Sequence, residues 1–526
     1  MPKVLVSDPI DQAGIEILSQ VAQVDYEPEL SPGALVERIG QYDALMIRSG
    51  TRVTAEVIEA AQRLKIIGRA GVGVDNVDIQ AATRKGIMVV NSPEGNTVAA
   101  AEHAIALMMS LSRYIPQANA SLKAGQWKRS QFTGVEVYKK NLGIVGLGRI
   151  GLHLARVARA LGMQILVYDP FISSERALQA GARLVDLEQL FREADYITLH
   201  IPRTPETTHL VNAKTLALMK PTARIINCAR GGIIDEQALY TALKDGQIAG
   251  AALDVFEEEP LGDSPLRSLD REIVLTPHLG ASTEEAQSNV AIDVAEQIRD
   301  VLLGLPARSA VNIPGLRPEV LQELKAYLEL AETLGNLVGQ LAEGRIDALD
   351  IRLQGTLAEK DAQPIVVAAL KGLLTPALRE RVNYVNASLE AKERGIRVTE
   401  TRDRSVTDYA GSILLTAHGP NGPRTVTGAL LGQEEVRITN IDEFPISVAP
   451  SRHMLITLHR DMPGIIGKVG SFLALYNVNI AGMQVGRKLI RGEAVMMVSL
   501  DDPLPEGLIG EIESVSGIRK AYTVNL

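Results

Sequence analysis

Cysteine is almost absent from the 526-residue sequence, which contains only Cys228. A single cysteine excludes a disulfide within the chain and is typical of proteins kept in a reducing compartment. We therefore expect a cytoplasmic protein, and we assign no metal site to it.

Long hydrophobic runs are absent as well. No apolar segment approaches the roughly 18 residues that a membrane-spanning helix needs. The N-terminal stretch MPKVLVSDP is too short for a secretory signal and runs directly into a predicted strand. We expect a soluble protein without a membrane partner.

Blocks of positive charge are missing too. The chain has 54 lysines and arginines against 63 aspartates and glutamates, which gives a formal net charge of -9. This balance gives no sign of a basic surface that would bind nucleic acid. Small anions must therefore be bound by individually placed arginines.

The order of apolar runs predicts the first part of the fold. The length suggests about three to four domains. Up to about residue 92, the runs KVLVSD, DALMIRS, KIIGRAG and IMVVNS alternate with helical patterns, which predicts a parallel, doubly wound sheet. The alanine-rich stretch NTVAAAEHAIALMMSLSRYIPQANASLKAG then predicts a long helix with Asn96 as its N-cap.

A second doubly wound α/β domain is predicted from NLGIVGLGRIG to EIVLTPHLG. A helical stretch follows and ends at Gly304 and Pro306, and the polar VNIPGLRPEV indicates a domain boundary near residue 312. Residues from about 318 to 450 mix helical and strand-like patterns, as in an α+β domain. The remaining residues predict the βαββαβ order of a ferredoxin-like unit.

GLGRIG, at residues 146–151, matches the GxGxxG pattern of dinucleotide-binding sites and lies between a strand-like run and a helical one. Gly146 allows a tight turn, Gly148 lets the backbone approach a pyrophosphate, and Gly151 permits close packing of helix on strand. Arg149 and Ile150 supply backbone amides to the phosphates.

Asp169 follows the glycine pattern after 18 residues, at the end of the strand-like ILVYD. It should accept hydrogen bonds from the adenosine ribose and repel a 2′-phosphate. NAD is therefore favoured over NADP as the cofactor.

Three side chains follow predicted strands of the second domain, namely Arg230, Glu259 and His278. Hydride transfer between a hydroxy acid and NAD needs a carboxylate anchor, a proton acceptor and a group that tunes the acceptor. In an open parallel sheet, the ends of these strands lie beside the dinucleotide. Taken singly, none of these residues identifies a site, because a lone histidine is more often inert and Arg230 also fits a helix-entry position on the surface.

Together, VGLGRIG, NCARGGIID, DVFEEEP and TPHLGAST make the sequence resemble the D-2-hydroxyacid dehydrogenase family. The segment from about 312 and the C-terminal LHRDMPGIIGKVG extend the resemblance to the long members, which oxidise 3-phosphoglycerate. The resemblance implies two Rossmann or flavodoxin-like domains: a substrate-binding domain of residues 1–95 and 282–311, and an NAD-binding domain of residues 96–281. An intervening domain of residues 312–450 and an ACT domain of residues 451–526 complete the implied organisation.

The resemblance also implies roles for individual residues. His278 becomes the acid/base, Glu259 its partner, and Arg230 the anchor of the substrate carboxylate. In oxidation, neutral His278 takes the proton of the C2 hydroxyl as hydride passes to NAD. Further implied cofactor contacts are Cys228, Ala229, Arg230, Asp254, His278, Gly280 and Ala281, and the substrate contacts are Arg48, Ser49, Asn96, Arg230 and His278.

The sequence departs from the pattern of some relatives at a position that concerns recognition of the phosphate group. Some relatives carry a basic residue after the serine of the IRS motif, where this chain has Gly50. Phosphate recognition then depends on Arg48 and on groups that the motifs do not identify. Arg69 in GRAGVG is a candidate for this contact, and a structural role for it is an equal alternative.

The C-terminal ACT resemblance implies L-serine as an effector, bound by His459, Asp461 and Asn479. The alternative is a dimerisation module without ligand sensing. Because ACT domains usually bind effectors between paired copies, we expect an oligomer, and the resemblance implies a homotetramer.

The expected function is therefore the NAD-dependent oxidation of 3-phospho-D-glycerate to 3-phosphohydroxypyruvate, which begins phosphorylated L-serine biosynthesis. One alternative is a dehydrogenase for glyoxylate, hydroxypyruvate or another 2-hydroxy acid. A second is an NAD(H)-sensing corepressor, because such relatives retain the same three catalytic residues.

The run DVFEEEP contains three adjacent glutamates, for which we expect different roles. Glu259 precedes Pro260 in the family motif and lies 19 residues before a histidine that needs a carboxylate. Glu257 and Glu258 have no such predicted partner, so we expect them to be surface charges or residues at the rim of the site.

Overall fold

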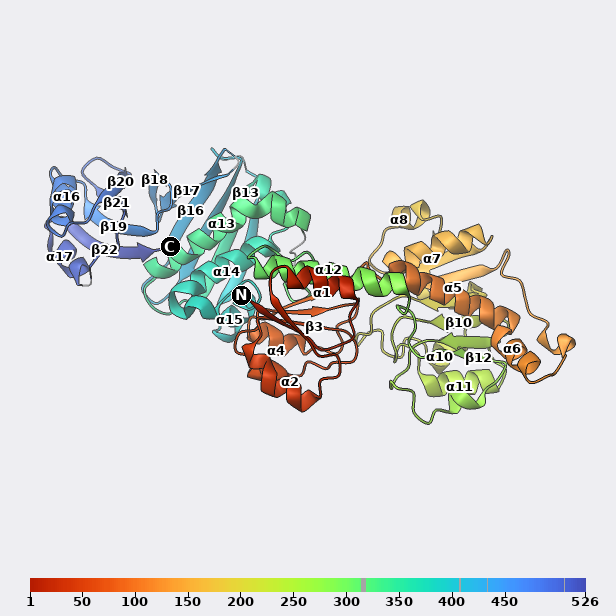
Figure 1. Ribbon diagram of the computed structural model, residues 1–526. Coiled ribbons are helices and arrows are strands. Elements are labelled where there is room, and N and C mark those ends of the chain that lie inside the picture. The colour runs from red at the N-terminus through yellow and green to blue at the C-terminus, as the bar shows by residue number, and fades with distance from the viewer. Residues whose placement is uncertain (314–317, 406–407, 433, 506) are drawn as a thin grey trace.

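Four sheets, one in each of four domains, organise the chain in the computed structural model, which describes residues 1–313, 318–405, 408–432, 434–505 and 507–526. The first domain lies between the second and the third, and the fourth forms the end beyond the third (Figure 1). The predicted α/β class is confirmed, including both doubly wound sheets and the βαββαβ unit. The predicted linker VNIPGLRPEV includes residues 314–317, which lie outside the described residues.

The first domain is a parallel sheet in the strand order β2-β1-β3-β4-β5. Helix α12 (Glu284–Leu302) comes from far along the chain and packs Val294 and Ile298 on this sheet. Gly68 makes room, because a Cβ there would lie 2.5 Å from a methyl carbon of Val294. The other elements are β1 (Lys3–Val6), α1 (Gln12–Ser19), β2 (Gln23–Tyr26), α2 (Pro32–Arg38), β3 (Ala44–Ile47), α3 (Ala55–Ala60), β4 (Ile66–Arg69), α4 (Ile79–Arg84) and β5 (Met88–Asn91).

The second domain is a seven-stranded parallel sheet in the order β12-β11-β10-β9-β6-β7-β8. Its strand order reverses between β6 and β9, which is where open α/β sheets bind ligands. The elements are α5 (Thr97–Arg113), α6 (Ile115–Lys123), β6 (Asn141–Val145), α7 (Arg149–Ala160), β7 (Gln164–Tyr168), α8 (Ser174–Gln179), β8 (Arg183–Leu184), α9 (Leu187–Glu193), β9 (Tyr196–Leu199), α10 (Ala213–Leu216), β10 (Arg224–Asn227), α11 (Glu236–Lys244), β11 (Gly250–Leu253) and β12 (Ile273–Leu275).

The long helix predicted from Asn96 is interrupted. Helix α5 ends at Arg113, and Tyr114 adopts a left-handed conformation with φ 52° before α6 begins. Pro116 is tolerated in the first turn of α6, whereas inside a continuous helix it would remove a hydrogen bond and clash with the preceding turn. Asn96 occupies the predicted N-cap position, but its side chain makes no capping hydrogen bond.

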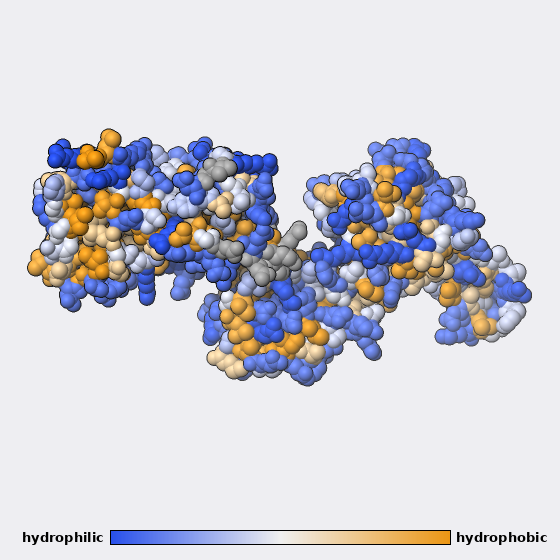
Figure 2. Space-filling view, turned by 90° about the horizontal axis from the view of Figure 1, so that it is seen from above, coloured by the Kyte–Doolittle hydropathy of each residue, from blue (hydrophilic) through white to orange (hydrophobic). Residues whose placement is uncertain are grey.

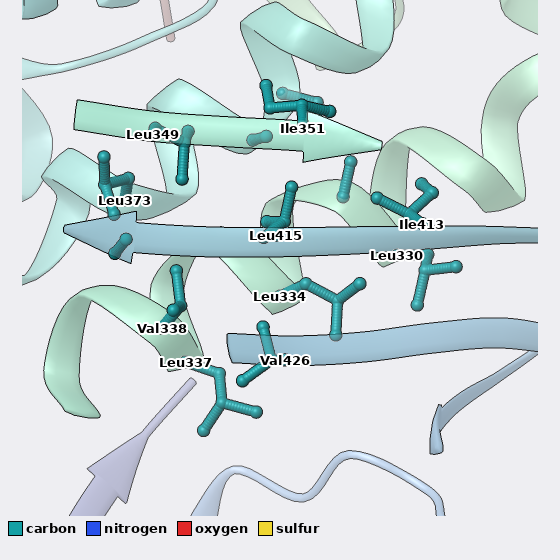
Figure 3. Close-up of a cluster of buried hydrophobic side chains, with 14 of the residues drawn as sticks. Leu330, Leu334, Leu337, Val338, Leu349, Ile351, Leu373, Ile413, Leu415 and Val426 are labelled. Atoms are coloured by element: carbon teal, nitrogen blue, oxygen red, sulfur yellow. The ribbon is translucent and has the colours of Figure 1, made fainter. Parts of the chain in front are cut away.

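The third domain packs two helices on a mixed sheet of order β14-β13-β15-β16-β17-β18. Leucines of α13, among them Leu330 and Leu334, point onto β13, β15 and β16 (Figure 3). Its elements are α13 (Pro318–Leu341), β13 (Ala348–Gly355), α14 (Gln363–Leu378), α15 (Ala387–Glu393), β14 (Arg397–Asp403), β15 (Gly411–His418), β16 (Arg424–Leu431), β17 (Glu435–Ile441) and β18 (Phe444–Val448).

The fourth domain has the sheet order β20-β21-β19-β22, with both helices on one face. Its other face shares a core with the third domain, because Met454, Ile456 and Met497 join the cluster that contains Ile446. No helix of the described chain is long and apolar enough to cross a membrane. The elements are β19 (His453–Arg460), α16 (Ile465–Leu475), β20 (Ile480–Arg487), β21 (Glu493–Leu500), α17 (Leu508–Ser514) and β22 (Ile518–Asn525).

Helices α13 and α14 approach so closely that glycine is required at their contact. A Cβ on Gly372 would lie 2.0 Å from the carbonyl oxygen of Glu332, and one on Gly335 would lie 2.2 Å from that of Ala369. Backbone oxygens cannot rotate away, so the helices themselves must separate if either glycine gains a side chain.

We therefore predict that Gly372→Ala destabilises the third domain by about 1–3 kcal/mol. Gly33→Ala is the matched control, because a Cβ at this position of α2 meets nothing within 4 Å. Calorimetric unfolding and hydrogen exchange across residues 324–341 measure the effect. Equal stability of the two variants would contradict the close helix contact.

Candidate active site

Side chains at the carboxyl ends of strands from the first two domains meet at the junction of these domains. Arg230, which follows β10, reaches across to the first domain, where its Nε lies 3.2 Å from Asp75 Oδ2. Arg48 follows β3, and Arg69 is the last residue of β4. The junction therefore collects groups that are far apart in the sequence.

His278 and Glu259 form a hydrogen-bonded pair, with 2.7 Å between His278 Nδ1 and Glu259 Oε2. The bond to Glu259 raises the pKa of His278 against the opposing effect of burial. Burial alone would raise the pKa of Glu259, but the bonds from His278 and the Phe256 amide lower it. Both directions favour a charged pair, and Nε2 of His278 stays available for proton transfer.

The turn that carries His278 is held by Asp254. His278 has φ 55°, a left-handed conformation that residues other than glycine seldom adopt. The His278 amide donates to the Asp254 carbonyl (2.8 Å), and the amides of Leu279 and Gly280 donate to its carboxylate at 2.7 and 2.8 Å. Asp254 is completely buried, so it fixes the turn, and a direct contact with a cofactor stays a prediction.

Three arginines converge at the junction. Burial, together with the positive charges of Arg230 and Arg48, lowers the pKa of Arg69 to about 10. Within the described residues, the buried Nε of Arg69 has no hydrogen-bond partner. The carboxylates of Asp75 and Asp8 oppose this effect only in part. A largely buried guanidinium close to two others is the arrangement expected of an anion site. The structure therefore favours the binding alternative for Arg69.

Glycines in GRAGVG leave space for these guanidinium groups. A Cβ on Gly71 would lie 1.9 Å from Nη1 of Arg69, and one on Gly73 would lie 2.2 Å from Nη2 of Arg230. Gly50 is explained similarly, since its Cβ would meet a carboxylate oxygen of Asp8 at 2.4 Å. That carboxylate also accepts from the amide of Arg48, at 2.5 Å, and so shapes the loop.

The other predicted substrate residues are Ser49 and Asn96. Ser49 is exposed, next to Arg48. Asn96 lies directly before α5, and among the described residues its buried Oδ1 has no hydrogen-bond partner. An unpaired buried acceptor is unusual and is satisfied by a ligand or water with a free donor.

The glycine-rich loop has the shape that a dinucleotide needs. Gly146 has φ 94°, and a Cβ on Gly151 would lie 2.2 Å from the Gly146 carbonyl oxygen. Gly148 caps α7 without a side chain and has open space around it, which leaves the first-turn amides free for phosphate. Oδ2 of Asp169 accepts from the Leu147 amide at 2.9 Å, next to this loop.

The remaining predicted cofactor residues surround the same site. Arg149 forms an ion pair with Glu94, with 3.1 Å between Nε and Oε1, and Ile150 lies in the first turn of α7. Burial, followed by the charge of Asp254, raises the pKa of Cys228, so its thiol is neutral. Ala229 donates its amide to Asn227, and Ala281 follows the Gly280 turn.

The acidic run departs from expectation at one position. Oε1 of Glu257 accepts from the Glu236 amide at 3.2 Å and lies 3.1 Å from Nε2 of His209. The prediction that Glu257 has no partner is therefore wrong, since His209 comes from a distant loop that the motif does not reveal. Glu258 is exposed, as expected.

The three predicted effector residues do not meet within one chain. His459 is buried at the end of β19 that pairs with Ala494, and Asp461 accepts from Nη1 of Arg487 at 2.9 Å. Asn479 lies before the opposite end of β20 and donates to Asp501 at 2.5 Å.

Comparison with known proteins gives consistent matches along the chain. Residues 105–280 match the model "D-isomer specific 2-hydroxyacid dehydrogenase, NAD binding domain", residues 323–442 match "D-3-phosphoglycerate dehydrogenase intervening domain", and residues 453–517 match "ACT domain". The solved TT0316 protein from Thermus thermophilus is 32% identical, with a TM-score of 0.55, and the match covers 59% of this chain and 99% of that one.

Two curated relatives match the whole length. The D-3-phosphoglycerate dehydrogenase of Synechocystis sp. is 68% identical over 527 residues, covering 100% of this chain and 95% of that protein. The D-3-phosphoglycerate dehydrogenase of Methanocaldococcus jannaschii is 47% identical over 100% of both.

The His278–Glu259 pair predicts a specific pH dependence for the oxidation of a 2-hydroxy acid. We predict that neutral His278 is the base, so kcat/KM should rise with pH through its pKa, which Glu259 holds above the ordinary value of about 6.5. In Glu259→Gln the pKa falls, so this rise moves to lower pH. Turnover falls by about tenfold or more, because the imidazolium is no longer stabilised.

Glu258→Gln is the matched control, since Glu258 is exposed in the same run. Its pH profile should coincide with that of the unmodified protein. Equal shifts in both variants would show that the charge of the run, and not the paired carboxylate, sets the profile.

Proposed function

The chain belongs to the D-3-phosphoglycerate dehydrogenases of the D-2-hydroxyacid dehydrogenase family, and we propose that it oxidises 3-phospho-D-glycerate to 3-phosphohydroxypyruvate with NAD. This reaction begins the phosphorylated route to L-serine. The observation that carries the proposal is the His278–Glu259 pair beside three convergent arginines. It combines a base with anchors for a substrate that has two anionic groups.

His278 performs the proton transfer. Its Nδ1 faces Glu259, so Nε2 takes the proton from the C2 hydroxyl. Glu259 stabilises the resulting imidazolium and keeps the ring in one orientation. In the reverse direction, the protonated ring returns this proton to the carbonyl oxygen.

Different arginines are suited to the two anionic ends of the substrate. Arg230 interacts electrostatically with His278, so it is suited to hold the carboxylate next to C2. Arg69 and Arg48 lie on the first domain and are suited to the phosphate. Ser49 and Asn96 add neutral hydrogen-bonding groups on the same side.

NAD supplies the hydride acceptor when it is bound. The loop from Gly146 to Gly151 offers backbone amides at the start of α7, and Asp169 lies where the adenosine ribose is recognised in this fold. The carboxylate of Asp169 disfavours a 2′-phosphate by charge repulsion. We propose Arg149, Ile150, Cys228, Ala229, Gly280 and Ala281 as further contacts.

The test is a panel of D-2-hydroxy acids with NAD, in which formation of NADH is followed. We expect kcat/KM for 3-phospho-D-glycerate to exceed that for D-glycerate by about 100-fold, the value of one or two charge-assisted hydrogen bonds. Arg69→Gln should remove most of this preference, while Arg84→Gln, at an exposed position of α4, should keep it.

Other outcomes identify the alternatives. Turnover of glycerate or glyoxylate without turnover of the phosphorylated substrate would indicate another 2-hydroxy acid dehydrogenase. NADH binding without turnover of any substrate would favour a corepressor-like role. Equal turnover with NADP would contradict the role of Asp169.

We also propose a homotetramer with L-serine as effector. Two separate surfaces expose apolar side chains: the arm around α6, where Trp127 is 83% exposed, and the fourth domain, where Leu475 is 82% exposed. Figure 2 shows hydrophobic residues, in orange, on the surface of the fourth domain. Two distinct two-fold contacts of this kind assemble four chains.

The arrangement of the fourth domain supports an effector site between two chains. Strand β20 is an edge strand and can pair with its copy. Antiparallel pairing would bring Asn479 of the partner subunit to the end of the sheet that carries His459 and Asp461. Asp461 suits the amino group of serine, and Asn479 suits its carboxylate or hydroxyl.

Mixed oligomers test this arrangement by serine binding. Asp461→Asn and Asn479→Ala should each abolish binding when alone. A mixed pair of the two variants contains one site with both changes and one intact site, so we expect about half of the sites to return in calorimetric titration. No recovery in mixed oligomers would contradict a site shared between chains.

A further inference from the structure

His103 connects helix α5 to the turn of the proposed base. The helix packs on β10, β11 and β12, and it directs this side chain toward the end of the sheet. His103 Nε2 lies 3.1 Å from Asp254 Oδ1 and 3.2 Å from Thr276 Oγ1. The side chain is 19% exposed, whereas that of Asp254 is 0% exposed, so the contact lies beneath the surface.

The protons available at Thr276 and His103 determine which atom donates in this contact. The Thr276 hydroxyl has one proton, which it donates to Asp254 Oδ1 at 2.6 Å. Nε2 of His103 must therefore carry a proton and donate as well. With the amides of Leu279 and Gly280, the buried carboxylate receives four donors, of which only His103 comes from outside the segment 276–280.

We propose that His103 is a positioning residue for His278, acting through Asp254. This proposal rests on the function proposed above, and it assigns a role to a residue outside the family motifs named above. Asp254 holds the left-handed turn at His278 through its carbonyl and its carboxylate. A buried carboxylate with an incomplete set of donors is costly, and it retains its charge and place only while the donors are present.

The consequence concerns the orientation of His278 and not the binding of substrate. Within the described residues, His103 makes no hydrogen bond or ion pair with His278 or with the three convergent arginines. Loss of its donor loosens the turn and misaligns His278 Nε2 with the C2 hydroxyl. Chemistry then slows while ground-state affinity stays similar.

His103→Ala and His103→Gln provide the test in the full-length protein. The glutamine amide can place a donor near the position of Nε2, whereas alanine cannot. We expect kcat with 3-phospho-D-glycerate to fall about tenfold in His103→Ala, with KM changed by less than about twofold. His103→Gln should restore most of kcat.

A second measurement needs no cofactor or turnover. The amides of Leu279 and Gly280 should exchange hydrogen faster in His103→Ala than in the unmodified protein, and His103→Gln should restore protection. His418→Ala is the matched control, because it removes a histidine whose Nε2 lies 2.8 Å from Asp350 in the third domain. It should leave this segment unchanged.

The outcomes separate the two proposals. Unchanged exchange of Leu279 and Gly280 in His103→Ala overturns the positioning role, and so does an equal loss of kcat in the alanine and glutamine variants. Absence of turnover by the unmodified protein overturns the proposed function instead, and the exchange measurement still decides the role of His103.

Discussion

An imbalance of charge at the junction of the first two domains governs the active site. Arg48, Arg69 and Arg230 approach one another from three strand ends, and burial is the larger effect on the charge of Arg69, followed by repulsion from the other two arginines. The fold tolerates this because glycines at 71 and 73 leave room and because Asp75 contacts Arg230 from the other domain. A bound anion at the position proposed for the substrate would offset this repulsion.

Much of the fold was predictable because parallel strands buried on both faces give continuous apolar runs. The exceptions have local causes. Strands β2 and β8 lie at or near sheet edges and lack such runs, and Tyr114 interrupts a helix whose alanine content suggested continuity. The carboxylate partner of His278 was predictable from the DVFEEEP motif. The burial of Arg69 and the histidine partner of Glu257 depend on tertiary contacts that no local pattern records.

The turn at His278 depends on a residue outside the motif that contains the histidine. TPHLGAST identifies the histidine, yet its left-handed backbone is maintained by Asp254 from another strand end. Such a conformation persists only where the surroundings over-determine it. The position of one imidazole thus depends on a carboxylate that is entirely hidden from solvent.

The core shared by the third and fourth domains sets a limit on how the chain can be divided. Met454 and Ile456 belong to the same cluster as Ile446, and Gln340 of α13 makes hydrogen bonds with the backbone of Asn525 in both directions. Removing the fourth domain at its apparent boundary would leave the third with an uncovered apolar face, which promotes aggregation. In protein engineering, these two domains should therefore be transferred together. A chimera should be joined before α13 and not between the third and fourth domains.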